Sequence, residues 1–220
     1  MPRDEQRRQK ALMKKRSKQK AAKQHSHAQS FASLSAQSIL RQARTYPVYE
    51  CMISPTWQKD QPGLVEIVLA RQQPDGDICF GVYLVDKLCL GLKNTFANVN
   101  FSRSRYQSEI HDKIAGRSGL KECPLELAHQ MIYASIDYAR QFGFEPNKDF
   151  ALSQFLLLPR GELQEPYQIT FGKDGKPLYI SGPNDNPQRI IRQLEKTAGP
   201  GNYDYIAMLG DPGGDFDDDI

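Results

Sequence analysis

Residues 64–101 read LVEIVLARQQPDGDICFGVYLVDKLCLGLKNTFANVNF, and this stretch decides the fold because it is the densest run of strand-forming residues in the chain. Apolar residues alternate along 65–70 and dominate 78–85, as they do in β-strands. Between these runs lies Pro74-Asp75-Gly76, a turn signal whose glycine can adopt a positive φ. The two runs therefore predict an antiparallel hairpin.

A third strand is expected directly after this hairpin. Both faces of 78–85 are apolar, which is the pattern of an interior strand that is covered on both sides. Asp86-Lys87 is the only polar break before the apolar residues 88–92, so we predict a tight turn and a strand over 88–92. The outcome is a three-stranded meander.

Further strands are predicted on either side of the meander. Residues 47–53 predict a first strand at the edge of the sheet, ahead of a proline. Residues 169–171 and 178–180 flank a turn centred on Asp174-Gly175, which predicts a second hairpin. A closing strand is expected over 203–209.

Helices are predicted from apolar residues that recur every three or four positions. A surface helix is expected over 102–116, and a longer helix that packs across the sheet over 124–142. Pro187 opens a third helix after the N-cap candidate Asn186. Residues 150–158 are apolar but too few to distinguish helix from strand. The predicted fold class is α+β, a mainly antiparallel sheet packed against two or three helices.

Composition predicts one domain with charged ends. The chain has 220 residues, 39% hydrophobic and 25% charged, which is enough for one sizeable core. No apolar run approaches a membrane span, and the charged N-terminus has no secretory h-region, so we expect a soluble, cytoplasmic protein. We predict a flexible or partly helical basic arm over 1–44, a single globular domain over 45–209, and an acidic tail over 210–220.

The charge of these ends suggests a partner. Residues 1–24 hold ten Lys or Arg and two acidic residues, a net charge of +8, whereas 211–220 hold five Asp and no base. Such an arm attracts RNA, DNA or a ribonucleoprotein through phosphate neutralisation, and a solubilising tail is the equally weighted alternative. The candidate nucleic-acid-binding residues are Arg7, Arg8, Lys10, Lys14, Lys15, Arg16, Lys18, Lys20 and Lys23.

Three segments of the chain resemble sequences of a known protein family. The stretches GVYLVDKLCLGLKNTF (81–96), IYASIDYARQFGFEP (132–146) and FGKDGKPLYISGP (171–183) resemble a widespread family of bacterial proteins of unknown function. The likeness spans about 49–206. It implies a bacterial, cytoplasmic single-domain protein, and it carries over no catalytic residue and no cofactor.

Four polar residues in apolar surroundings are candidate catalytic groups. Asp86 and Lys93 bracket the predicted third strand, where Lys93 can hold an anion and Asp86 a proton or a divalent cation. His129 and Asp137 lie on the long helix, where His129 can act as a base or ligand. The structural alternatives are a solvated turn and strand end, a histidine bonded to a carbonyl, and a local Asp137–Arg140 pair.

Metal and nucleotide signatures are missing from the sequence. The four cysteines form no CxxC pair, so reduced thiols are expected. A zinc site from Cys51, Cys89, Cys123 and His129 would match no standard spacing. The chain contains no phosphate loop, dinucleotide fingerprint, nucleophile elbow or HExxH motif, and we predict no metal and no cofactor.

Three functions remain open at this point. The favoured one is a non-enzymatic nucleic-acid- or ribonucleoprotein-associated module docked through its basic arm. The first alternative is a hydrolase or nuclease-like enzyme that uses Asp86, Lys93, His129 and Asp137. The second is a protein-interaction module that pairs through its oppositely charged tails, an interaction that salt would screen.

Overall fold

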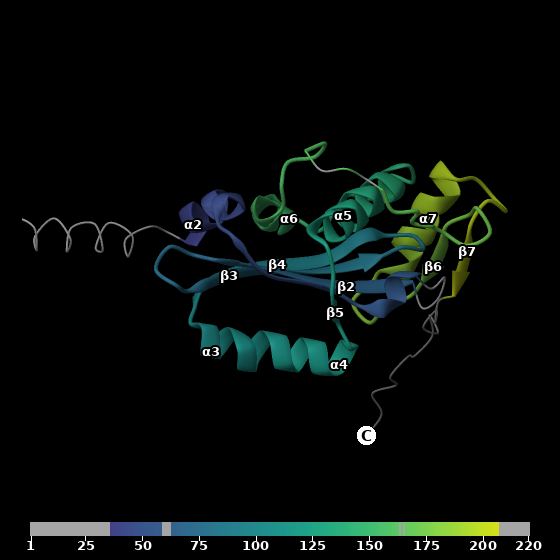
Figure 1. The fold of residues 1–220 in the computed structure, drawn as a ribbon. Helices are drawn as coiled ribbons and strands as arrows, with labels where there is room; N and C mark the ends of the chain where they lie inside the picture. Colours follow the sequence, from purple (N-terminus) through teal and green to yellow (C-terminus); the bar gives the residue numbers. More distant parts are fainter. Residues whose placement is uncertain (1–35, 59–62, 163, 165, 207–220) are drawn as a thin grey trace, which may run out of the picture. The chain divides into compact units, whose positions relative to one another are not determined.

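The structure is a computed structural model that describes residues 36–58, 63–162, 164 and 166–206. Its centre is a five-stranded antiparallel sheet in the order β4-β3-β2-β1-β5 (Figure 1). The strands are β1 Val48–Ile53, β2 Leu64–Gln72, β3 Ile78–Asp86, β4 Gly91–Phe101 and β5 Lys121–Glu122. The pairing of β2 with β3 and of β3 with β4 confirms the α+β class and the meander.

The third strand begins later than the sequence predicted. Residues 88–90 form the turn between β3 and β4, and the strand starts at Gly91, whose φ is 65°. The prediction of a strand over 88–92 was wrong for its first three residues, because the Asp86 carboxylate accepts their backbone N–H groups. β1 is also not at the outer edge, since β5 pairs with Met52 and Ile53.

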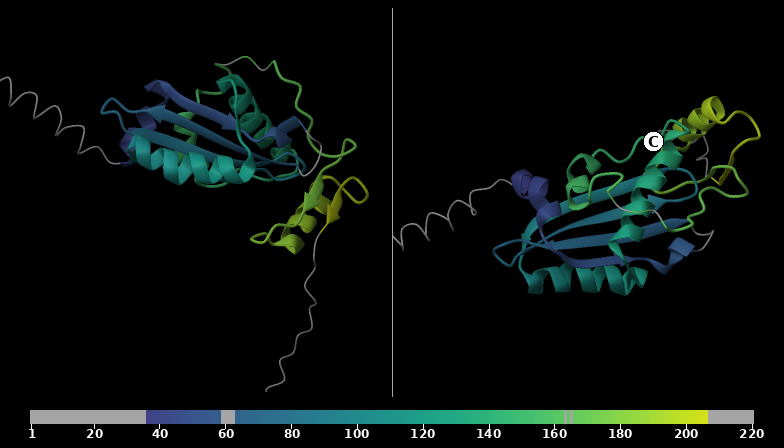
Figure 2. Two further views of the ribbon diagram at one scale, coloured as in Figure 1. Left: turned by 60° about the horizontal axis from the view of Figure 1, so that its bottom comes forward. Right: turned by 45° about the horizontal axis from the view of Figure 1, so that its top comes forward.

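Helices cover both faces of the sheet (Figure 2). On one face, α3 Arg103–Tyr106, the π-helical η3 Gln107–Ala115 and α4 Gly116–Ser118 form the predicted surface helix. Tyr106 from this helix packs with Phe80 and Phe101 in a buried cluster on that face. Covering from both sides explains why every residue of β3 except Leu84 is buried.

The opposite face carries the long helix and a shorter one (Figure 1). α5 Leu125–Arg140 is the predicted long helix, with Pro124 at its N-cap position. α6 Phe150–Ser153 and η4 Gln154–Leu156 resolve residues 150–156 as helical. The Tyr83 hydroxyl of β3 donates to the Ser153 carbonyl at 2.8 Å, which ties α6 to the sheet.

The second hairpin predicted from the sequence is not formed. β6 Leu178–Ile180 pairs in parallel with β7 Asp204–Ile206, and α7 Pro187–Thr197 connects them. The Asp174-Gly175 turn exists, but it closes only the bridge between Lys173 and Lys176. Phe171 instead stacks on Tyr138 of α5 with ring centroids 5.3 Å apart, so a contact from elsewhere in the chain replaces the local pairing.

Short helices precede the sheet. They are α2 Ala36–Gln42 and η1 Ala43–Thr45, so the last part of the predicted arm, 36–44, is helical. A third short helix, η2 Pro55–Gln58, lies between β1 and β2. The chain divides between Ile39 and Leu40, and the sheet with its covering helices belongs to the unit from Leu40 onward. Within the described residues, no helix is long and apolar enough to cross a bilayer. The nine predicted nucleic-acid-binding residues of the arm and the acidic tail lie outside the described residues.

Candidate functional site

Asp86 closes the turn between β3 and β4. Its side chain is buried, with 5% exposed, and its carboxylate accepts the backbone N–H groups of Leu88, Cys89 and Leu90 at 2.8, 3.2 and 3.3 Å. Burial raises the pKa of Asp86 and these N–H groups partly oppose that rise. Every hydrogen bond it accepts therefore has a structural purpose.

Lys93 forms an ion pair with a residue 92 positions away. Its Nζ lies 2.7 Å from Oδ2 of Asp185, which also accepts the Gly182 N–H at 2.8 Å and the Tyr179 hydroxyl at 3.3 Å. Burial acts to raise the pKa of Asp185, but Lys93 and the Gly182 N–H outweigh it and hold that pKa below its usual value. Lys93 and Asp185 line an open cavity of about 580 Å³ in which the lysine charge is already compensated.

His129 and Asp137 also have structural partners. His129 is fully buried, and its Nε2 lies 3.0 Å from the Leu158 carbonyl oxygen, as the structural alternative expected. Asp137 accepts two hydrogen bonds from Nη1 of Arg160, at 2.7 and 2.8 Å. The expected local pair of Asp137 with Arg140 is not formed. Across the residues that the structure describes, no hydrogen bond or ion pair joins any two of the four candidates.

The thiols give no metal centre. Cys51 and Cys123 lie together, with their sulfurs 3.6 Å apart, whereas Cys89 packs in a separate cluster with Tyr179 and Leu194. All four cysteines are free. Among the described residues, no group of three or more His, Cys, Asp or Glu side chains could hold a metal ion.

Three arginines instead meet at one cavity between the helices of the α5 face. The cavity measures about 360 Å³, and Arg44 of η1, Arg140 of α5 and Arg160 of the loop after η4 contribute to its wall. Its remaining lining residues are aromatic, apolar or amide-bearing: Tyr133, Ile136, Phe150, Gln154 and Pro159. No carboxylate belongs to that lining, so its charged groups are all positive.

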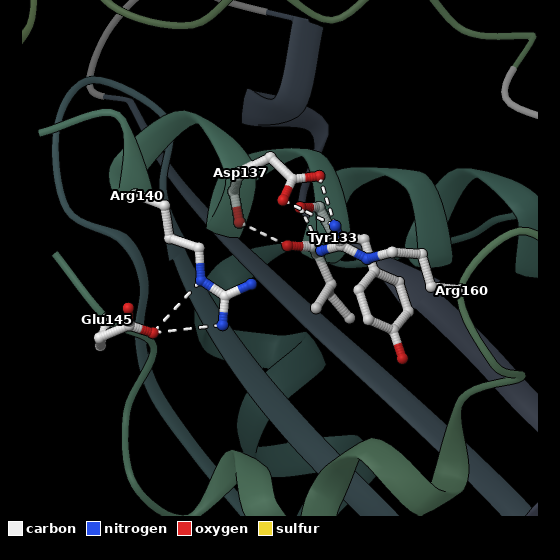
Figure 3. A network of polar contacts seen from close by, with 7 residues as sticks. Tyr133, Asp137, Arg140, Glu145 and Arg160 are labelled. Carbon is white, nitrogen blue, oxygen red and sulfur yellow. Dashed lines mark hydrogen bonds and ion pairs between the residues drawn. The ribbon is translucent and has the colours of Figure 1, made fainter. Parts of the chain in front are cut away.

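Two of the arginines are held by carboxylates beside the cavity (Figure 3). Arg160 binds Asp137 and lies over the Tyr133 ring, with its guanidinium carbon 4.9 Å from the ring centroid. Arg140 donates from Nε and Nη2 to one oxygen of Glu145, at 3.2 Å each. A guanidinium has five N–H donors, so both arginines keep donors that these pairs do not use.

Arg44 has no carboxylate partner in the described structure. Its guanidinium carbon lies 5.4 Å from the centroid of the Phe155 ring, and its Nε is buried without a hydrogen-bond partner there. A buried N–H without an acceptor is costly, so this Nε is a donor that the described structure leaves unused. The wall of the cavity therefore offers unused donors from three guanidinium groups.

Such a wall is suited to a phosphate or a similar oxyanion, because guanidinium groups bind these oxygens in a bidentate fashion. Sequence reasoning missed this site. Arg44 was counted within the basic arm, Arg140 only as a helix partner of Asp137, and Arg160 not at all. The three positions are spread over more than a hundred residues and form no local pattern, so only the fold brings them together.

Comparison with known proteins adds no relative to this picture. No protein-family model, no curated protein and no solved structure matches the chain.

Proposed function

We propose that the protein is a nucleic-acid-associated module in which the basic N-terminal segment supplies general attraction and the arginine cavity holds a phosphate group. The observation that carries this proposal is the cavity wall with Arg44, Arg140 and Arg160 and no carboxylate. Phosphate oxygens are the acceptors that such a set of donors fits best.

The aromatic residues beside the arginines suit a nucleotide rather than a bare anion. Phe150 lines the cavity and is half-buried, whereas the neighbouring Tyr133 ring is already covered by Arg160, so Phe150 is the ring that a base would stack on. Single-stranded nucleic acids bind through phosphate contacts together with aromatic side chains on which bases stack. The combination supports a single-stranded RNA or DNA segment as the ligand.

Competition from the protein's own carboxylates is weak. Glu145 is 74% exposed and Arg140 47% exposed, and exposed ion pairs contribute only about 0–1 kcal/mol. A nucleic-acid phosphate can therefore replace Glu145 at Arg140 at small cost. Arg160 would keep its Asp137 pair and its place on the Tyr133 ring, and would contribute from its remaining N–H groups.

The N-terminal segment contributes through charge alone. Its net charge of +8 over residues 1–24 favours association with any polyanion through counterion release. Charge of this kind gives affinity without sequence recognition. The hydrolase or nuclease-like alternative has less support, because Asp86, Lys93, His129 and Asp137 all have structural partners.

Fluorescence anisotropy with a labelled single-stranded RNA and a DNA of the same sequence tests the proposal. The full chain is compared with a chain lacking residues 1–35 and with the double variant Arg44→Gln/Arg140→Gln. The double variant Arg192→Gln/Lys196→Gln, on the exposed side of α7, removes the same charge away from the cavity.

We expect the deletion and the cavity variant each to weaken binding by about tenfold or more, since a charge-assisted hydrogen bond contributes about 1.5–3 kcal/mol. The control variant should change binding less than about twofold. Equal loss in the cavity and control variants would reject the cavity, and unchanged binding after the deletion would reject the arm. Absence of binding by the full chain would reject both.

A further inference from the structure

Cys51 and Cys123 face each other where β1 meets β5. The ladder pairs Met52 with Glu122, so the next residues along the two antiparallel strands, Cys51 and Cys123, lie opposite one another. The Cys123 N–H donates to the Cys51 carbonyl oxygen at 3.0 Å. Their Sγ atoms lie 3.6 Å apart although the residues are separated by 72 positions. The fold has thus brought two thiols into contact.

The backbone at this point already suits a covalent bond. Opposed residues in an antiparallel pair have Cα atoms about 4.5–5.5 Å apart. Disulfides span about 4.4–6.8 Å between Cα atoms, with the sulfurs at about 2.05 Å. Closing the gap between the sulfurs therefore requires rotation of the two side chains and no rearrangement of the strands.

The two thiols differ in exposure and in acidity. Cys51 is buried, with 7% exposed, whereas Cys123 is half-buried and precedes the N-cap of α5. The hydrogen bond from the Cys51 thiol holds the pKa of Cys123 below its usual value, although burial opposes this. That same hydrogen bond and burial raise the pKa of Cys51. Cys123 is therefore the thiol that ionises first and meets solvent first.

We propose that Cys51 and Cys123 form an oxidation site at which a hydroperoxide converts the thiol pair into an intramolecular disulfide. The Cys123 thiolate attacks one peroxide oxygen and the O–O bond breaks, which gives a sulfenic acid at Cys123 and a hydroxide or alkoxide. The Cys51 sulfur then attacks the Cys123 sulfur, and the S–O bond breaks as the disulfide forms. The departing hydroxide takes the Cys51 proton and leaves as water.

Electrons balance over the two steps. The two sulfurs together lose two electrons, and the hydroperoxide gains them to become water, or an alcohol, beside the water released in the second step. A thiol reductant reverses the reaction through a mixed disulfide. The product ties β1 to β5, the short strand that leads from α4 on one face of the sheet to α5 on the other (Figure 1).

The other two cysteines serve as internal controls. Cys79 and Cys89 are both fully buried. Burial raises the pKa of Cys79 to about 12 and that of Cys89 further still. In the described structure neither of them has a second thiol within hydrogen-bonding distance, so neither should oxidise to a disulfide within the folded chain.

Treatment of the full-length protein with hydrogen peroxide, followed by denaturation and maleimide labelling, measures the reaction. Mass spectrometry should show a fall from four labelled thiols to two and a peptide cross-link between Cys51 and Cys123 that dithiothreitol removes. Cys123→Ser and Cys51→Ser should each abolish the cross-link. Cys79→Ser should retain it, with a fall from three thiols to one.

Cys123→Ser changes a half-buried side chain, so it tests the site even where the buried Cys51→Ser variant folds poorly. Three results would each overturn the proposal. They are unchanged labelling of all four thiols, a sulfinic acid at Cys123 without a cross-link, and disulfides that join two chains instead of two residues of one chain.

Discussion

The Asp86 carboxylate accepts three backbone N–H groups of one turn. Replacing it with alanine leaves three N–H groups of the β3–β4 turn without their acceptor, two of them buried and that of Leu90 partly buried. We expect Asp86→Ala to lower the free energy of unfolding by about 2–4 kcal/mol, because each buried unsatisfied donor costs about 1–3 kcal/mol and water can reach some of them. Urea denaturation followed by circular dichroism measures this change.

Asp75→Ala is the matched control for Asp86→Ala. Asp75 also accepts a backbone N–H, from Asp77 at 3.1 Å, but this turn is solvent-exposed. The control should cost less than about 1 kcal/mol. If Asp86→Ala proved as stable as the control, the carboxylate would not hold the turn, and a chemical purpose for Asp86 would return to consideration.

The ion pair of Lys93 and Asp185 predicts a pH dependence. The pKa of Asp185 in the folded protein lies below its usual value of 3.8. The ionised carboxylate therefore stabilises the fold above that value, and the contribution is lost as pH falls through the folded pKa. At neutral pH, Asp185→Asn should cost about 1–2 kcal/mol, since Lys93 is 21% exposed and solvent screens part of the attraction.

Denaturation at a series of pH values between about 7 and 3 measures that contribution. The destabilisation by Asp185→Asn should shrink as pH falls towards 3. Asp174→Asn changes an exposed turn aspartate that forms no ion pair in the described part of the chain, and it should leave the pH profile of the wild type unaltered. A constant difference between Asp185→Asn and wild type at every pH would contradict the ion-pair account.

The contacts of single polar residues were the part of the structure that the sequence could not predict. Of the four polar residues singled out in the sequence, Asp86 and His129 are buried, whereas Lys93 is partly exposed and Asp137 is exposed. Their partners could not be deduced, since Asp185 lies 92 positions from Lys93 and Arg160 lies 23 from Asp137. Ion pairs of that separation depend on which elements pack together. For this reason the sequence alone favoured the structural interpretation of these residues without excluding the catalytic one.

Helices and strands were predicted more successfully from the sequence than the partners of single residues. β2, β3, α5 and α7 were predicted because each has its own period, turn or cap, such as Asn186 accepting the Arg189 N–H at 3.0 Å. The pairing of β6 with β7 was not predictable, because these strands are parallel and a helix separates them. The Asp174-Gly175 turn favoured a hairpin locally, and the stacking of Phe171 on Tyr138 decided otherwise.

The close packing of β4 against α5 depends on Gly91. Its φ is 65°, and a Cβ added there would lie 2.6 Å from the Ser135 carbonyl oxygen and 2.7 Å from the Ala139 Cβ. Gly91→Ala should therefore destabilise the protein by about 3 kcal/mol, about 1 from the backbone conformation and about 2 from overpacking. Gly119 also has a positive φ, 59°, but nothing lies within 4 Å of its added Cβ.

Gly119→Ala thus isolates the conformational cost, and it should lower stability by only about 1 kcal/mol. Thermal unfolding of both variants measures the difference, which reports the close approach of β4 to α5. Equal losses in the two variants would mean that α5 shifts away from Gly91 without cost.

At the scale of the whole molecule, the proposed function depends on two separate sources of positive charge. The first 24 residues carry a net charge of +8 in a segment poor in apolar residues. The folded unit adds a small cavity in which three guanidinium groups have fixed neighbours. A long run of positive charge increases the rate of encounter with a polyanion, whereas a small set of donors lining one cavity limits how one phosphate is held.

Salt dependence separates these two contributions. Each phosphate contact with a single strand adds about 0.7 to the slope of log affinity against log salt concentration. Removing residues 1–35, which contain ten Lys or Arg, should reduce that slope by several units. Arg44→Gln/Arg140→Gln should reduce it by only about 0.7–1.4, because one or two contacts are lost, while still weakening affinity by about tenfold at any one salt concentration.

Anisotropy titrations between about 50 and 300 mM salt measure these slopes. Arg192→Gln/Lys196→Gln should leave the slope within about 0.3 of the wild type, since neither side chain borders the cavity. A slope that stays unchanged after the deletion would assign the phosphate contacts to the folded unit alone. A cavity variant with the slope and the affinity of the wild type would leave Arg44 and Arg140 without any part in binding.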